Sequence, residues 1–197
     1  MDTITMEMLL DLIRREGDRR YLEEPVSQLE HAWQCGHLAA KSGASLALQL
    51  ACWLHDVGHL LMGLPSAAQN LDLREGHEQV AAPVLLALWG PEVSEPVRLH
   101  VRAQRYLVAR HPKYAHKLSK GQQHLLQLRG GGLSEDECLA FEAQPFWREA
   151  LQLRIWDDLC KKPGWFAITR TEALEMLAHL MGQVGRRDGV FTQISSK

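Results

Sequence analysis

The sequence lacks the features that mark nucleic-acid-binding, membrane and secreted proteins. It has no basic excess, since 22 Lys and Arg oppose 24 Asp and Glu, and this balance disfavours nucleic acid as a partner. Its longest uncharged, largely apolar stretch, residues 42–54, is shorter than the roughly 20 residues that span a bilayer. Asp2 and Glu7 precede any apolar run, unlike in a signal peptide. We therefore expect a cytoplasmic protein with no membrane or obligate protein partner.

Paired cysteines and strand-forming residues are also scarce. Cys35, Cys52, Cys138 and Cys160 form no Cys-x-x-Cys pair, which argues against a zinc ribbon and indicates reduced thiols. Only 3 Tyr and 4 Phe are present, and alternation of apolar and polar residues is hard to find. Apolar residues recur instead at helical spacing. The sequence therefore predicts an all-α fold.

Helix start and stop signals divide the chain into consecutive helices. The segment from Ser27 to Glu30 is a capping box, Ser134 begins a second one, and Gly58 and Gly63 are expected to loosen the chain. No repeat or long linker is present, so residues 1–197 are expected to form one domain with a frayed tail at 185–197. The predicted helices, with their flanking caps, cover residues 4–17, 27–43, 45–56, 76–90, 94–109, 134–145, 146–160 and 171–184.

Residues that bind transition metals recur in order along the chain, each near the end or the inner face of a predicted helix. Imidazole and carboxylate together suit iron, manganese, cobalt or zinc, whereas magnesium and calcium prefer all-oxygen ligands. Asp56, next to His55, can bridge two ions about 3.5–4 Å apart. The sequence therefore predicts a dinuclear metal site. Its candidate ligands are His31, His55, Asp56, His77, His100 and Asp157.

The remaining histidines have weaker claims to a role. His59 follows His55 by one helical turn and can point into the same cavity as a ligand, a proton donor or a core residue. We assign it a substrate-contacting role, so that Asp56 and His59 are the predicted catalytic residues. His37 lies on a different helical face from His31, and its interpretation is structural. The others are expected to be surface or hydrogen-bonded residues: His111, His116, His124 and His179.

The ordered set resembles a known superfamily. A His, a His-Asp pair and a late Asp are the pattern of HD-domain metal-dependent phosphohydrolases, and two additional histidines mark its dinuclear branch. The chain is similar, over about residues 15–165, to the HD-domain phosphonate oxygenases. The matching segments are Tyr21-x-x-Glu24, Gln28-Leu-Glu-His31, His55-Asp-Val-Gly-His59, His77-Glu, His100 followed by Arg105-Tyr-Leu, Gly130-Gly131 and Arg154-x-Trp-Asp157. The resemblance implies an HD-domain helical bundle around a dinuclear metal site, and the helix predicted at 171–184 follows this bundle.

The resemblance also implies a reaction. A mixed-valent Fe(II)/Fe(III) centre would use O₂ to cleave the C–P bond of a small 1-hydroxyphosphonate, giving phosphate and a carboxylate. Members of the family act on 2-amino-1-hydroxyethylphosphonate, on its trimethylamino analogue or on hydroxymethylphosphonate. The first two would give glycine or glycine betaine. One iron would be held by His31, His55, Asp56 and Asp157, and the other by Asp56, His77 and His100.

Substrate contacts are also expected from the resemblance. They are Tyr21, Glu24, His59, Gln104, Ser119 and Arg154. Glu24 would bind a substrate ammonium, which predicts a cationic nitrogen at C2. Gln104 stands where the aminoethyl-specific enzyme has a lysine, and glutamine cannot neutralise a phosphonate. Arg102 and Arg105 lie nearby and can compensate, while Arg154 can clamp phosphonate oxygens or form a surface ion pair.

Two other functions stay open at this point. A metal-dependent phosphohydrolase acting on a nucleotide or phosphate monoester would use the same ligand types, with a hydroxide attacking phosphorus. A non-catalytic HD-type signalling module is the third interpretation, although such modules more often lack ligands and none is missing here.

Overall fold

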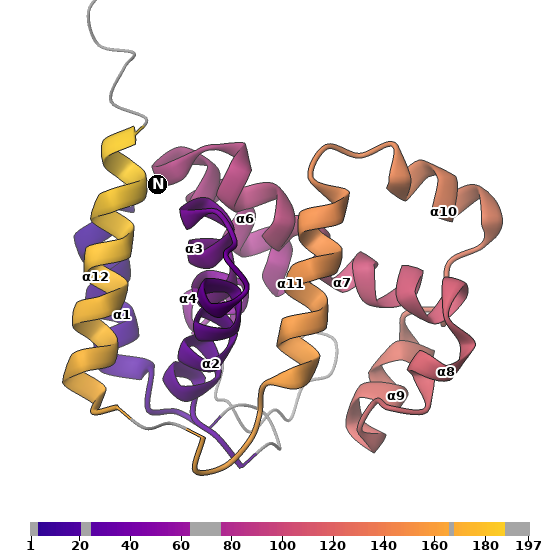
Figure 1. The fold of residues 1–197 in the computed structure, drawn as a ribbon, viewed down its shortest axis with the longest axis horizontal. Coiled ribbons are helices and arrows are strands. Elements are labelled where there is room, and N and C mark those ends of the chain that lie inside the picture. Colours follow the sequence, from indigo (N-terminus) through magenta and orange to yellow (C-terminus); the bar gives the residue numbers. More distant parts are fainter. Residues whose placement is uncertain (1–3, 21–24, 64–75, 166–167, 188–197) are drawn as a thin grey trace, which may run out of the picture.

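The computed structural model describes residues 4–20, 25–63, 76–165 and 168–187, and over these residues it contains helices and no strand (Figure 1). The all-α prediction is therefore confirmed. The helices are α1 (Met6–Glu16), α2 (Gln28–Lys41), α3 (Leu46–Leu54), α4 (Val57–Leu61), α6 (His77–Trp89), α7 (Pro91–Arg110), α8 (Pro112–Ala115), α9 (Lys120–Leu128), α10 (Glu135–Glu142), α11 (Trp147–Leu159) and α12 (Arg170–Arg187).

The predicted helix caps are present. Ser27 and Ser134 each begin a capping box, in which the serine side chain accepts from the third helical residue and the glutamate there accepts from the serine N–H. Ser45 caps α3 by accepting from Leu48 N at 3.2 Å. A further capping box at Ser119 begins α9, a helix that the sequence analysis did not identify.

Several boundaries differ from the prediction. α7 begins at Pro91 rather than near Ser94, because a proline at the first helical position is already preorganised for the helix. α12 continues to Arg187, so residues 185–187 are helical and not part of a tail. Gly58 does not loosen the chain, since it lies buried within α4. The short helices α4 and α8 were also missed, because four or five residues are too few to show a helical period.

The core is built around α3, which packs against α2, α7, α11 and α12. Figure 1 shows α12 beside α1 at one end of the molecule and α8 to α10 at the other, with the remaining helices between them. The main apolar cluster draws on α1 to α4, α6, α7, α11 and α12. A smaller one joins α7, α10 and α11 around Tyr106 and Phe141. Among the described residues, no helix is both long and apolar enough to cross a membrane.

Candidate metal centre

Four helices of the core, and the junction between two others, carry the six predicted ligands to one place. His31 lies in the first turn of α2, His55 and Asp56 lie between α3 and α4, and His77 is the first residue of α6. His100 lies midway along α7 and Asp157 near the end of α11. All six residues are buried, and each is at most 7% exposed. Residues as far apart as 126 positions in sequence thus form one polar cluster in the core.

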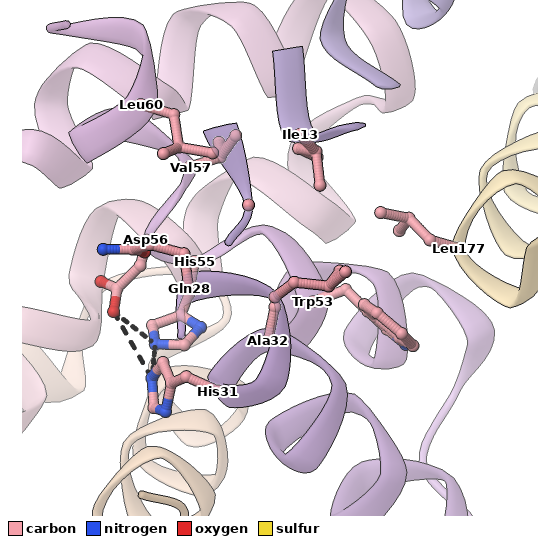
Figure 2. Close-up of a pocket in the computed structure, with 12 residues that line it drawn as sticks. Ile13, Gln28, His31, Ala32, Trp53, His55, Asp56, Val57, Leu60 and Leu177 are labelled. Atoms are coloured by element: carbon pink, nitrogen blue, oxygen red, sulfur yellow. Dashed lines mark hydrogen bonds and ion pairs between the residues drawn. The ribbon is translucent and has the colours of Figure 1, made fainter. Parts of the chain in front are cut away.

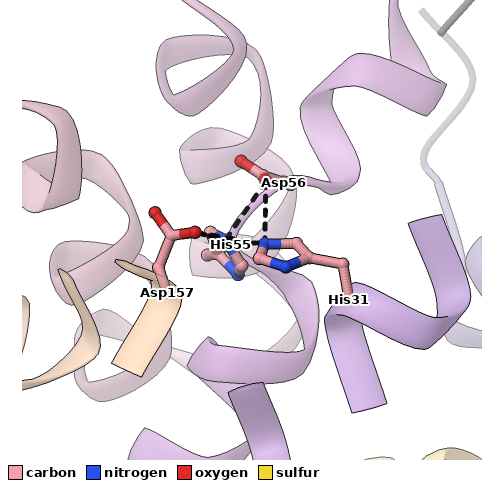
Figure 3. Close-up of side chains that lie close together, drawn as sticks. All are labelled: His31, His55, Asp56 and Asp157. Carbon is pink, nitrogen blue, oxygen red and sulfur yellow. Dashed lines mark hydrogen bonds and ion pairs between the residues drawn. The ribbon is translucent and has the colours of Figure 1, made fainter. Parts of the chain in front are cut away.

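The first group consists of His31, His55, Asp56 and Asp157 (Figure 3). The Nε2 atoms of His31 and His55 are 3.2 Å apart, and His31 Nε2 is 3.2 Å from Asp157 Oδ1. Asp56 Oδ2 lies 3.1 Å from His55 Nε2 and 3.5 Å from His31 Nε2. Figure 3 shows these nitrogens and oxygens directed toward one another.

The second group lies on the other oxygen of Asp56. Asp56 Oδ1 is 3.0 Å from His77 Nε2 and 3.8 Å from His100 Nε2, and the two imidazole nitrogens are 3.2 Å apart. His59 Nε2 is 4.0 Å from the same oxygen, and the His59 ring stacks on His77 with centroids 4.1 Å apart. Asp56, His59 and His77 form a second set that could hold a metal ion. Asp56 therefore connects two groups of donors.

Hydrogen bonds to the backbone orient two of the imidazoles. His55 Nδ1 donates to the carbonyl of Cys52 at 2.8 Å, and His100 Nδ1 donates to that of Val97 at 2.6 Å. Because a carbonyl only accepts, each ring carries its proton on Nδ1 when neutral. The Nε2 lone pair of each ring then faces the centre, which is the arrangement of a metal-ligating histidine.

The donor atoms fit metal ions at both groups. A metal–nitrogen bond of about 2.0–2.1 Å places neighbouring ligand atoms roughly 3.0–3.4 Å apart, depending on the geometry. The closest contacts in the two groups, 3.0–3.2 Å, match this spacing. Asp56 Oδ2 is also buried and accepts no hydrogen bond from the described residues, although it faces two imidazole nitrogens. The cluster could therefore hold two metal ions.

The buried carboxylates of the cluster also favour bound cations. Burial raises the pKa of Asp56, but His55, His31 and His77 outweigh burial and hold that pKa well below its usual value. Burial has the same effect on Asp157, where Arg154 and Lys161 lower the pKa. Two ionised carboxylates thus share a buried site.

The imidazoles of the two groups differ in protonation. Burial lowers the pKa of His55, but Asp56 and Asp157 outweigh burial and raise it to about 10. In the second group, burial and His77 lower the pKa of His59 to about 3 and that of His100 well below its usual value. His59 and His100 are therefore neutral, the form in which imidazole binds metals.

A cavity of about 50 Å³ borders the second group. Besides the histidines and Asp56, its wall includes Gln104, Arg129, Arg154 and Lys161. Gln104 is only 2% exposed, so a neutral amide takes this part of the wall. Arg102 and Arg105 are not among the described residues that line it.

Arg154 is part of the buried site rather than of a surface ion pair. It is 5% exposed, its Nη1 lies 2.9 Å from Asp157 Oδ2, and it also pairs with Asp158. Lys161 Nζ is 3.3 Å from Asp157 Oδ1. Gln34 holds the segment that carries Lys161, because its side chain accepts from the N–H of Lys161 at 3.0 Å and donates to the carbonyl of Lys162 at 3.0 Å.

The other predicted substrate contacts are placed differently. Ser119 is exposed and caps α9, where its side chain accepts from Gln122 N at 3.3 Å, and it is not among the residues lining the cavity. Gln122, one turn into the helix, does line it. Tyr21 and Glu24 lie outside the described residues, so their roles stay predictions. The sequence analysis missed Arg129 and Lys161. Lys161 lies beyond the end of α11 with a φ of 80°, so its pairing with Asp157 does not follow from helical spacing.

A second, apolar pocket of about 20 Å³ reaches the centre from its other side (Figure 2). Figure 2 shows His31, His55 and Asp56 on one side of this pocket and apolar side chains, Ile13 and Leu177 among them, on the other. Asp56 is the one described residue that lines both cavities. A polar ligand is thus accommodated next to His77 and His100.

Comparison with known proteins places the chain in a family. No family model matches it. It is 41% identical to the hydroxymethylphosphonate dioxygenase of Gimesia maris over 158 residues. These residues are 79% of this chain and 78% of the relative. It is 31% identical over 157 residues to the 1-hydroxy-2-(trimethylamino)ethylphosphonate dioxygenase (glycine-betaine-forming) of Leisingera caerulea, with 80% of each chain covered. An uncharacterised protein of Acanthamoeba polyphaga mimivirus is 30% identical over 160 residues, which cover 78% of this chain and 71% of the relative.

The all-helical fold and the buried histidine–aspartate cluster define an HD-type domain with a candidate metal site. The chain belongs to the family of HD-domain phosphonate dioxygenases. The predicted family and the prediction of an oxygenase are therefore confirmed, and the interpretation as a phosphohydrolase is not favoured.

Proposed function

We propose that this protein is a mixed-valent di-iron oxygenase that uses O₂ to cleave the C–P bond of a small 1-hydroxyphosphonate. The observation that carries the proposal is the placement of Asp56, whose two oxygens each face a separate group of imidazole nitrogens beside a cavity rich in cations. A pair of iron ions, Fe(II) and Fe(III), would supply Lewis acidity and one-electron chemistry with O₂.

The two groups would bind the ions unequally. One ion would be held by His31, His55, Asp157 and Oδ2 of Asp56, and the other by His77, His100 and Oδ1 of Asp56. With His59 placed in the cavity wall as a substrate contact, the second group has three protein donors against four in the first, and it borders the cavity. It therefore leaves room for substrate and O₂ on the side where a polar ligand fits.

The cavity residues would bind and orient the phosphonate. Arg154 presents a planar guanidinium that can donate to two oxygens of one phosphonate, and Lys161 adds a compact positive charge. His59 lies in the same wall, and its neutral ring can hydrogen-bond to the substrate hydroxyl or to a phosphonate oxygen. Holding the hydroxyl and the phosphonate together fixes the C1 carbon next to the second group.

Hydroxymethylphosphonate is the substrate that we favour. The described residues of the cavity wall include cations and two carboxylates, Asp56 and Asp157. Both carboxylates face imidazole nitrogens, so neither is placed to bind a substrate ammonium. The relative named for hydroxymethylphosphonate is also more similar to this chain than the one named for the trimethylamino compound. One hydroxymethylphosphonate dianion and one O₂ balance to formic acid and hydrogen phosphate, so all four electrons come from the substrate.

The 2-amino and 2-trimethylamino compounds are the second candidates, and they would give glycine or glycine betaine. They depend on Glu24 acting as an ammonium site, together with Tyr21. A carboxylate facing an ammonium in a partly desolvated pocket contributes roughly 1.5–3 kcal/mol, which is about a tenfold to hundredfold effect on binding. This predicted interaction makes the substrate testable through a single residue.

A substrate panel tests the proposal. We expect phosphate release from hydroxymethylphosphonate to show a higher kcat/KM than release from either cationic compound, and Glu24→Gln to change this value less than about threefold. The measurement is initial phosphate release under air for wild type and Glu24→Gln with all three compounds. Faster turnover of a cationic compound that drops about tenfold or more in Glu24→Gln would instead establish the cationic substrate.

A further inference from the structure

A larger cleft, of about 440 Å³, opens near the metal centre and is rich in arginine. We call it the arginine cleft. Guanidinium groups outnumber carboxylates in its wall two to one, although the whole chain has a formal net charge of −2. A cleft that gathers charge of one sign raises the local concentration of ligands of the other sign. Its charged lining residues are Arg98, Arg102, Arg105, Arg129, Glu78 and Glu137.

Helix α7 contributes to both the arginine cleft and the metal cavity. At about 100° per residue, Arg102 and Arg105 share one side of the helix, while His100 and Gln104 lie on the side that lines the metal cavity. Val101 lies between these two sides and lines both cavities. The arginine cleft and the metal cavity therefore adjoin along α7.

Two arginines of the cleft are held in place by the surrounding structure. Arg98 forms a bidentate pair with Glu95 at 2.6–3.1 Å, and Arg105 Nε donates to the carbonyl of Gly131 at 2.9 Å. Guanidinium groups fixed in this way lose less freedom when they attract an anion. Arg102 lies between Arg98 and Arg105 in the sequence. It is half-buried and lines the same wall.

Arg129 is the one charged residue, among those described, that lines both the arginine cleft and the metal cavity. It caps the end of α9, where its backbone N–H donates to the carbonyl of Leu125 at 3.1 Å, and Gly130 then turns the chain with a φ of 87°. Its side chain lines the metal cavity together with His59, His77 and His100. Arg129 is therefore within electrostatic reach of the metal centre.

Arg129 adds a further cation to the wall of the metal cavity. Arg154 and Lys161 already pair with Asp157, at 2.9 and 3.3 Å, and Gln104 carries no charge. A phosphonate entering the cavity carries three oxygens, and those directed away from the metal ions need donors from the cavity wall. Arg129 supplies a planar guanidinium from a different helix, and this group can bind two phosphonate oxygens at once.

We propose that the arginine cleft is the route by which the phosphonate enters, and that Arg129, at its inner end, is a specificity-determining residue for a doubly charged anion. The inference rests on the proposed function, because it assumes a phosphonate ligand in the metal cavity. Arg102 attracts the anion from solution, and Arg129 holds it next to His59 and the second group.

Binding of methylphosphonate, which lacks the hydroxyl group and is not consumed, tests Arg129 separately from turnover. We expect Arg129→Gln to weaken binding to the metal-loaded protein roughly 10- to 100-fold, because a charge-assisted contact is lost. Arg129→Lys, which keeps the charge but not the fork, should fall between this variant and wild type. Isothermal titration calorimetry gives the affinity, and thermal unfolding confirms that each variant is folded.

Arg110→Gln is the matched control, because Arg110 lies on α7, pairs with Glu135 and Glu142, and does not line either cavity. The proposal is overturned if Arg129→Gln binds methylphosphonate as tightly as wild type, or if Arg110→Gln weakens binding equally. Arg102→Gln tests the entrance. It should lower kcat/KM at low ionic strength and approach wild type at high salt, where electrostatic attraction is screened.

Failure of the proposed function has a different signature. In that case wild type consumes none of the hydroxyphosphonates, while the methylphosphonate titration still reports whether Arg129 binds the anion. An Arg102→Gln variant whose kcat/KM depends on salt as wild type does would overturn the entrance route.

Discussion

Asp56→Asn is expected to lower bound iron from about two ions per chain to less than one, and to abolish turnover. The substitution keeps the shape of the side chain but replaces one of the two oxygens that face the separate imidazole groups and removes the negative charge. Each group then loses one negatively charged donor. The first group keeps Asp157 as its one remaining carboxylate, and the second group keeps none. Metal analysis by inductively coupled plasma mass spectrometry, with circular dichroism as a check on folding, measures the effect.

Two histidine variants serve as controls for this result. His100→Ala removes a donor from the second group only, so we expect it to lose about one ion per chain. His37→Ala should retain both ions, because His37 stacks on Trp33, at 4.7 Å between ring centroids, and takes no part in either group. A folded Asp56→Asn protein that still holds two ions would show that Asp56 is not the bridge.

Gly58→Ala is expected to destabilise the protein by about 3 kcal/mol or more, or to prevent folding. A Cβ atom at this position would lie 1.9 Å from the backbone carbonyl oxygen of His77, so α4 and α6 could not keep their present approach. The shift would separate Asp56 from His77. Urea unfolding measures the stability, and iron content measures the damage to the second group.

Gly121→Ala is the matched control, because Gly121 also lies in a helix but a Cβ there would meet no atom closer than 3.9 Å. Alanine is favoured over glycine inside a helix by about 1 kcal/mol, so this variant should be slightly more stable than wild type. Equal stability of Gly58→Ala and wild type would contradict the close packing of α4 on α6.

The sequence predicted the features that depend on neighbouring residues. The capping boxes at Ser27 and Ser134 depend on residues three positions apart, and both are present. Gly58 was misread because glycine signals either a flexible joint or a close contact, and only the packing of α4 against α6 decides between them. The six buried donors could be proposed as metal ligands because histidine and aspartate are rare in apolar helices unless they are paired or bind a ligand.

The cavity wall could not be predicted in the same way. Arg129 and Gln122 reach it because α9 and its end line the same cavity as α7, and no short-range pattern in the sequence predicts that placement. The same geometry places Ser119 on the surface as a helix cap, although its resemblance to the family predicted a substrate contact. The position of Lys161 depends on Gln34, which is 127 residues away in the sequence and accepts a hydrogen bond from the backbone N–H of Lys161 after the end of α11.

The most direct test of the central claim compares phosphate release from hydroxymethylphosphonate with and without O₂. The iron-loaded protein is first reduced to the mixed-valent state, and one portion is then assayed in an anaerobic vessel and another with an oxygen electrode. The account predicts no phosphate without O₂, and one O₂ consumed for each phosphate released in its presence. Undiminished release in the anaerobic vessel would contradict it, because only hydrolysis can take its oxygen from water.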